Sequence, residues 1–173
     1  MTEIEMIILV VFAAFGLTMS FLVHLSTFFG SNILNAFPST GFFDFGLIIV
    51  MLPTIFACKK ACAGEVRFDF WLLATKKAPT LLKIFCIILA VYVFFNFFIT
   101  VLVLNEGGVP SVINGQKVLN SHGKIIRELT DDEYALQKAY GKRTSSGHWM
   151  LFYCIAFTVL LSSLKEKQAQ NIE

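Results

Sequence analysis

Four long apolar blocks follow one another along the chain, separated by polar segments of unequal length. They cover residues 4–29, 42–58, 81–104 and 147–164. Because a helix rises about 1.5 Å per residue, about 20 apolar residues suffice to cross a hydrocarbon core of about 30 Å. The pattern predicts an all-α membrane protein with four transmembrane helices in a single integral membrane domain.

Residues 105–146 form the one sizeable hydrophilic segment, and its pattern indicates a folded module rather than an unstructured loop. Asn114-Gly115 is a strong signal for a two-residue hairpin turn. Ser121-His122-Gly123 separates two further runs of β-prone residues. We therefore expect a β-hairpin or a meander of two or three strands between the third and fourth transmembrane helices.

A short helix is predicted at the end of the same segment. Thr130 and Glu133 have the spacing of a capping box, which predicts a helix from residue 131 to about residue 140 that stops near Gly141. Ser145 or Ser146 then supplies the N-cap of the fourth transmembrane helix.

Composition agrees with a membrane location. Hydrophobic residues make up 56% of the chain and charged residues 15%, against roughly 25% charged in soluble domains. A net charge of +2 without a basic stripe gives no indication of nucleic-acid binding. The four cysteines lie in or beside the apolar blocks, so we do not expect a disulfide framework. We expect the pair Cys58 and Cys62 to be small buried or interfacial apolar residues, with acylation or metal binding as the alternatives.

The positions of basic residues set the expected orientation. Six basic residues between residues 59 and 83 and two in the C-terminal tail lie close to helix ends. The six in residues 105–146 are mixed with acids, and most of them lie farther from the apolar blocks. The positive-inside rule therefore predicts cytoplasmic termini and an extracytoplasmic module.

Five polar residues are candidates for a functional site: His24, Asp44, Asn96, His122 and His148. The three histidines fall on one predicted side of the membrane, where Asp44 or Glu106 could add a carboxylate to a shared metal site. No HxxxH, HxH or HExxH spacing supports such a site. We expect no cofactor and no bound metal, and a turn position for His122.

Simpler structural explanations exist for His148 and Asn96. With Trp149 and Tyr153, His148 fits an amphipathic belt at headgroup depth, where a helix N-terminus would keep its imidazole neutral and able to accept a hydrogen bond. Asn96 lies near the middle of its block, so its carboxamide should bond to another helix, with Thr18, Ser20 and Thr158 as partners. A polar site at His148 and a substrate path along Asn96 are the functional alternatives.

Several segments carry a recognisable pattern. Trp71 and Pro79 precede the third helix, which contains Asn96-Phe97; the loop reads NGxxVLxxHGKxIRELTxxEY from Asn114, and SGHWMxFY follows from Ser146. In these features the chain resembles a group of uncharacterised small polytopic proteins of the bacterial inner membrane. The resemblance implies that location and carries no catalytic or ligand assignment.

The favoured function is that of a non-enzymatic integral membrane protein embedded in the lipid bilayer, whose segment 105–146 binds a protein partner or caps the helices. One alternative is a small transporter or channel subunit with a path lined by Ser20, His24, Asn96 and Thr100. Another is immunity to a pore-forming toxin. An enzyme would require His24, His122 and His148 to converge.

Overall fold

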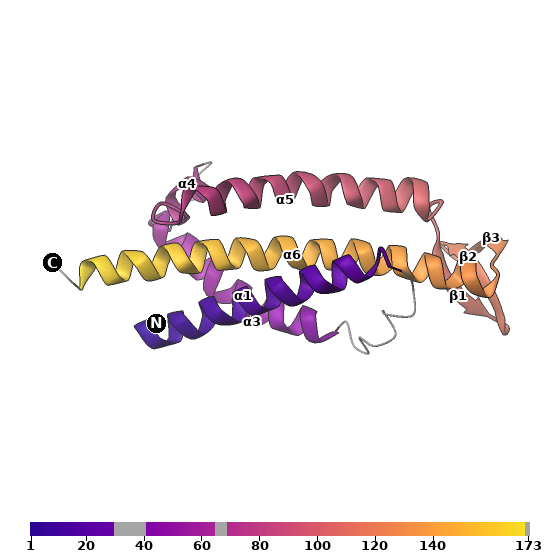
Figure 1. Ribbon diagram of the computed structural model, residues 1–173, viewed down its shortest axis with the longest axis horizontal. Helices are drawn as coiled ribbons and strands as arrows, with labels where there is room; N and C mark the ends of the chain where they lie inside the picture. Colours follow the sequence, from indigo (N-terminus) through magenta and orange to yellow (C-terminus); the bar gives the residue numbers. More distant parts are fainter. Residues whose placement is uncertain (30–40, 65–68, 172–173) are drawn as a thin grey trace. The chain divides into compact units, whose positions relative to one another are not determined.

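A computed structural model describes residues 1–29, 41–64 and 69–171. The helices are α1 (Glu3–Ser26), α3 (Gly41–Ala61), α4 (Phe70–Ala74), α5 (Thr80–Phe98), the π-helix η1 (Ile99–Leu104) and α6 (Asp131–Gln170); the strands are β1 (Val109–Ile113), β2 (Gln116–Ser121) and β3 (Lys124–Glu128) (Figure 1). The structure is thus mostly helical with one small sheet.

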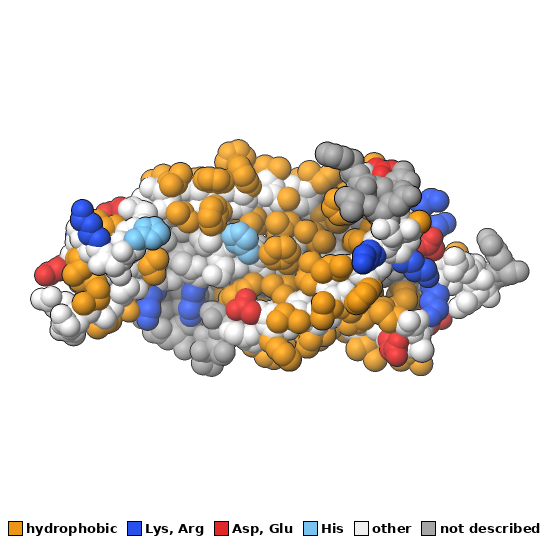
Figure 2. Space-filling model, turned by 180° about the vertical axis from the view of Figure 1, so that it is seen from behind, with side chains coloured by type: hydrophobic (Ala, Val, Ile, Leu, Met, Phe, Trp, Pro, Cys, Tyr) orange, Lys and Arg blue, Asp and Glu red, His pale blue; other side chains and the backbone are white. Residues whose placement is uncertain are grey.

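Four helical segments are long and apolar enough to cross a membrane: Glu3–Ser26, Gly41–Ala61, Thr80–Leu104 and Asp131–Gln170. The prediction of four such helices is therefore confirmed. Large apolar side chains remain exposed along them, including Ile8, Val11, Ile88 and Phe95, and orange hydrophobic side chains cover much of the face in Figure 2. Such a surface is stable in lipid and costly in water.

The contacts between residues divide the chain into two compact units. The first comprises residues 1–19, 40–90 and 149–173, and the second comprises residues 20–39 and 91–148. Helices α1, α5 and α6 each contribute residues to both.

In the first unit, Tyr153 of α6 packs against two glycines. A Cβ atom on Gly16 of α1 would lie 2.3 Å from Tyr153 Cε1, and one on Gly46 of α3 would lie 2.3 Å from Tyr153 Oη. Both glycines are therefore needed for the close approach of the tyrosine ring, because any side chain would collide with it. The Tyr153 hydroxyl donates a hydrogen bond to the Phe43 carbonyl oxygen, 3.1 Å away.

Two cysteines meet in the same unit. Cys86 Sγ of α5 lies 2.7 Å from Cys154 Sγ of α6 and 3.1 Å from Thr158 Oγ1. Both cysteines are buried and free.

The second unit contains the sheet, in which β1, β2 and β3 form an antiparallel meander. Asn114-Gly115 joins Ile113 to its partner Gln116, with φ of 51° and 82°. His122-Gly123 makes the second two-residue turn, with φ of 51° and 84°. Positive φ at both central residues matches the right-handed twist of the strands, so the hairpin signal and the turn position of His122 are confirmed.

The capping box is also present. The Thr130 backbone N–H donates to Glu133 Oε2 (2.8 Å), and the Glu133 N–H donates to Thr130 Oγ1 (3.3 Å). These bonds satisfy N–H groups that have no partner inside the helix.

The predicted stop near Gly141 is wrong, because α6 continues unbroken to Gln170. The predicted N-cap at Ser145 or Ser146 is wrong for the same reason. Both hydroxyls donate backwards within the helix, Ser145 to the Gly141 carbonyl oxygen (3.3 Å) and Ser146 to that of Lys142 (2.7 Å). A helical glycine costs only about 1 kcal/mol relative to alanine, which the packing of the residues that follow offsets.

Candidate functional site

Four of the five candidate residues lie in the second unit. His24 is in α1, Asn96 in α5, His148 in α6 and His122 in the turn between β2 and β3. Asp44 belongs to the first unit, where it accepts a hydrogen bond of 2.8 Å from Trp149 Nε1.

His24 is the centre of a buried polar cluster. Its Nδ1 lies 2.9 Å from Ser146 Oγ, and its Nε2 is hydrogen-bonded to the Tyr92 hydroxyl. The imidazole also meets the rings of Phe28 and Tyr92 edge-on, with centroids 5.6 and 5.5 Å apart. Helices α1, α5 and α6 therefore meet at this one side chain.

The hydrogen bonds around His24 form a chain in which Tyr92 donates to His24 and His24 donates to Ser146. Ser146 has a single hydroxyl proton, which it donates to the Lys142 carbonyl oxygen, so it accepts from His24 Nδ1–H. His24 Nε2 is then free to accept the Tyr92 O–H. A neutral His24 with its proton on Nδ1 satisfies every group in the chain Tyr92–His24–Ser146.

Asn96 approaches the same part of α6. Its Nδ2 donates a long hydrogen bond of 3.5 Å to the Arg143 carbonyl oxygen. A Cβ atom on Gly147 would lie 3.3 Å from Asn96 Nδ2 and 3.8 Å from His24 Cε1. The bond from Asn96 to another helix is therefore present, with a backbone carbonyl as its acceptor rather than the hydroxyl groups that we expected.

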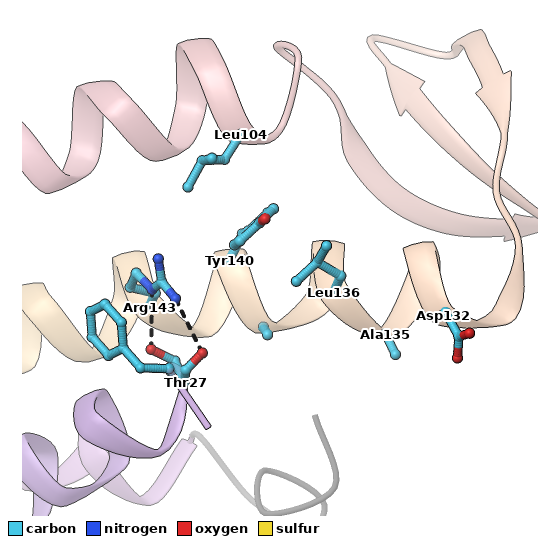
Figure 3. Close-up of a pocket in the computed structure, with 9 residues that line it drawn as sticks. Thr27, Leu104, Asp132, Ala135, Leu136, Tyr140 and Arg143 are labelled. Atoms are coloured by element: carbon cyan, nitrogen blue, oxygen red, sulfur yellow. Dashed lines mark hydrogen bonds between the residues drawn. The ribbon is translucent and has the colours of Figure 1, made fainter. Parts of the chain in front are cut away.

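Arg143 also belongs to the cluster, which the sequence analysis did not predict. Its Nε and Nη2 donate to Thr27 Oγ1 and to the Thr27 carbonyl oxygen, both at 3.2 Å (Figure 3). Its guanidinium lies 4.0 Å from the centroid of the Phe28 ring. Since Thr27 immediately follows α1, the cation lies at the negative end of the helix dipole.

His148 has a different environment from the predicted one. Because α6 does not begin at this residue, His148 is not at a helix N-terminus, and that prediction is wrong. Its Nδ1 donates to the Thr144 carbonyl oxygen (2.8 Å), and its ring meets Phe97 edge-on at 5.7 Å. The half-buried imidazole is thus held by its own helix and by α5.

Each histidine of the second unit has its own set of contacts. His24 is bonded to Ser146 and Tyr92, His148 to Thr144, and His122 occupies an exposed turn. Among residues 1–29, 41–64 and 69–171, no three His, Cys, Asp or Glu side chains are grouped as metal ligands would be.

Comparison with protein-family models, with curated proteins and with solved structures finds no match to the chain.

Proposed function

We propose that the chain is a non-enzymatic integral membrane protein that binds a protein partner through the module formed by β1–β3 and the first turns of α6. The observation that carries this proposal is an ion-pair network that gives the module a fixed surface. Arg127 of β3 donates to Glu106, which follows η1, at 3.1 Å and to Glu133 in α6 at 2.8 Å. The hydrogen bonds with Glu106 and Glu133 raise the pKa of Arg127.

Further hydrogen bonds support the module, one to η1 and one within the module itself. Gln137 Nε2 of α6 donates to the Leu104 carbonyl oxygen (3.0 Å), and the Leu129 N–H donates to the Lys117 carbonyl oxygen (2.8 Å). A small sheet is stable in water only with a hydrophobic face or with packing against a helix. The contacts with η1 and α6 supply the support that the sheet needs to present a fixed surface.

One face of the sheet presents apolar side chains to the surroundings. Val109, Asn120 and Ile125 stand in one cross-strand row, so their side chains lie on the same face. Val109 is 66% exposed and Ile125 is 47% exposed. In the described part of the chain no strand pairs with the outer edge of β3.

An exposed apolar row beside an open strand edge suits a partner that adds an extended segment to β3. The opposite edge is less suitable, because Pro110 in β1 has no N–H to donate. In this proposal the module lies outside the cytoplasmic membrane of a bacterium and both termini lie in the cytoplasm, as the basic residues near the helix ends favour.

Photo-crosslinking from the sheet in native membranes tests the proposal. A photoreactive residue at Ile125 should give one discrete adduct with a protein. The same residue at Val112, which is 57% exposed on the other face of β1, should give little. Val109→Asp should abolish the Ile125 adduct while the protein still inserts. Adducts with lipid alone, or equal adducts from Ile125 and Val112, would contradict partner binding through this face.

A further inference from the structure

A pocket of about 490 Å³ lies in the second unit beside Arg143. Its walls include Phe28, Leu104, Asp132, Leu136 and Tyr140. Figure 3 shows Leu136 and Tyr140 on the side of α6 that faces Leu104, with Asp132 at the beginning of the helix. The pocket thus combines apolar walls with one cation at one end and one carboxylate at the other.

The charge of Arg143 has no partner of opposite sign in the described part of the chain. Thr27 takes two of its five N–H groups, and the described residues provide no partner for the other three. Thr27 and the Phe28 ring hold the guanidinium in place. A fixed guanidinium edge with free N–H groups matches the paired oxygens of a phosphate.

The pocket lies where two membrane-spanning segments end. Thr27 comes directly after the candidate span Glu3–Ser26, and Leu104 is the last residue of the span Thr80–Leu104. The ends of such spans lie at the depth of lipid headgroups. A phospholipid therefore presents its phosphate at the level of Arg143.

We infer that this pocket binds the phosphate of an anionic phospholipid. The free N–H groups of Arg143 donate to the phosphate oxygens, and the acyl chains leave past Phe28, which is itself exposed. An anionic lipid is favoured over a zwitterionic one because the guanidinium is otherwise uncompensated. This site is separate from the protein-binding face of the sheet and does not depend on the function proposed for that face.

Native mass spectrometry of the full-length protein in a neutral detergent tests the site, with phosphatidylglycerol and phosphatidylcholine offered in equal amounts. The wild type should retain one phosphatidylglycerol in preference. Arg143→Gln should lower its occupancy at least about tenfold, since it removes the charge-assisted hydrogen bonds. Lys138→Gln is the matched control, because it removes one positive charge from the same helix at an exposed residue outside the pocket lining, and it should change nothing.

A second variant covers the case in which Arg143→Gln fails to fold. Ala135→Leu fills part of the pocket without altering Arg143, and it should lower lipid occupancy to a similar extent. Unchanged occupancy in either folded variant would overturn the inference. Displacement of the lipid by millimolar inorganic phosphate would also overturn it, because it would identify a soluble anion as the ligand.

Discussion

The two units of the chain hold their helices together in different ways. In the first unit, the Tyr153 ring packs against Gly16 and Gly46, and Trp149 stacks on Phe43 with centroids 4.7 Å apart. In the second unit, helices meet through directed hydrogen bonds at His24 and through the cation at Arg143. Steric fit dominates the first unit, and polar pairing dominates the second.

This difference indicates where ligand chemistry belongs. In the described part of the chain, the buried polar side-chain atoms without a hydrogen-bond partner all lie in the second unit. Besides the free N–H groups of Arg143, the oxygens Thr100 Oγ1, Gln137 Oε1 and Thr144 Oγ1 are buried without a hydrogen-bond partner in the described part of the chain. Such atoms are costly in a protein interior, so we expect specific binding in the second unit.

Gly16→Ala should have the largest effect on stability. Its Cβ would meet three ring carbons of Tyr153 at 2.3 to 2.6 Å, so α1 and α6 must move apart locally. We expect a loss of about 3 kcal/mol in the free energy of unfolding, measured by reversible denaturation in mixed micelles. A loss below about 0.5 kcal/mol would show that the ring does not pack against Gly16.

Gly46→Ala provides the matched test in the same unit. Its Cβ would collide only with the Tyr153 hydroxyl, because the next ring atom lies 3.6 Å away. Tyr153→Phe should therefore rescue Gly46→Ala and leave Gly16→Ala unrescued. Equal behaviour of the two glycine variants in the Tyr153→Phe background would contradict the described packing.

In the second unit, His24→Ala should cost about 2 kcal/mol, since it opens a cavity and leaves the Tyr92 hydroxyl without its partner. His122→Ala is the control from the exposed turn and should stay within about 0.5 kcal/mol of the wild type. The same denaturation measurement applies. Equal losses for the two variants would show that the hydrogen bonds of His24 do not stabilise this unit.

Trp149→Phe tests the clearest polar contact of the first unit. It removes the hydrogen bond to Asp44 while a ring remains to stack on Phe43, so the expected loss is about 1.5 kcal/mol. Asp44→Asn keeps an acceptor oxygen and should lose less. If Asp44→Asn proved the more harmful of the two, the charge of Asp44 would have a role beyond this bond.

Thr130→Ala should have the smallest effect, about 1 kcal/mol, because it removes one half of a capping box. The change should be local. Amide hydrogen exchange should accelerate at the first turn of α6 and stay unchanged around Ser146. Acceleration along the whole helix would contradict a local cap.

The features that the sequence predicted correctly depend on neighbouring residues. The turn at Asn114-Gly115 and the capping box at Thr130 each need only a few adjacent residues, and four apolar blocks are visible without tertiary information. The break at Gly141 was predicted on the same local grounds. It failed because Arg143, farther along the helix, bonds to Thr27, which directly follows α1, and Ser146 bonds to His24 of α1.

The residues that the sequence did not single out have distant partners. Arg143 bonds to Thr27, which is 116 residues away, and in the sequence it looked like one of several loop cations. Gly16 and Gly46 looked like ordinary small residues of transmembrane helices, because nothing near them indicates Tyr153. Such roles can be predicted only when it is known which helices are neighbours.

The most direct test of the polar pairing in the second unit is ¹⁵N NMR of histidine-labelled protein in lipid, with the His24 signals assigned by their loss in His24→Phe. We predict a protonated Nδ1 and an unprotonated Nε2 that accepts the Tyr92 hydroxyl. Ser146→Ala should shift mainly the Nδ1 signal and Tyr92→Phe mainly the Nε2 signal. A proton on Nε2, or signals that respond to neither substitution, would contradict the account.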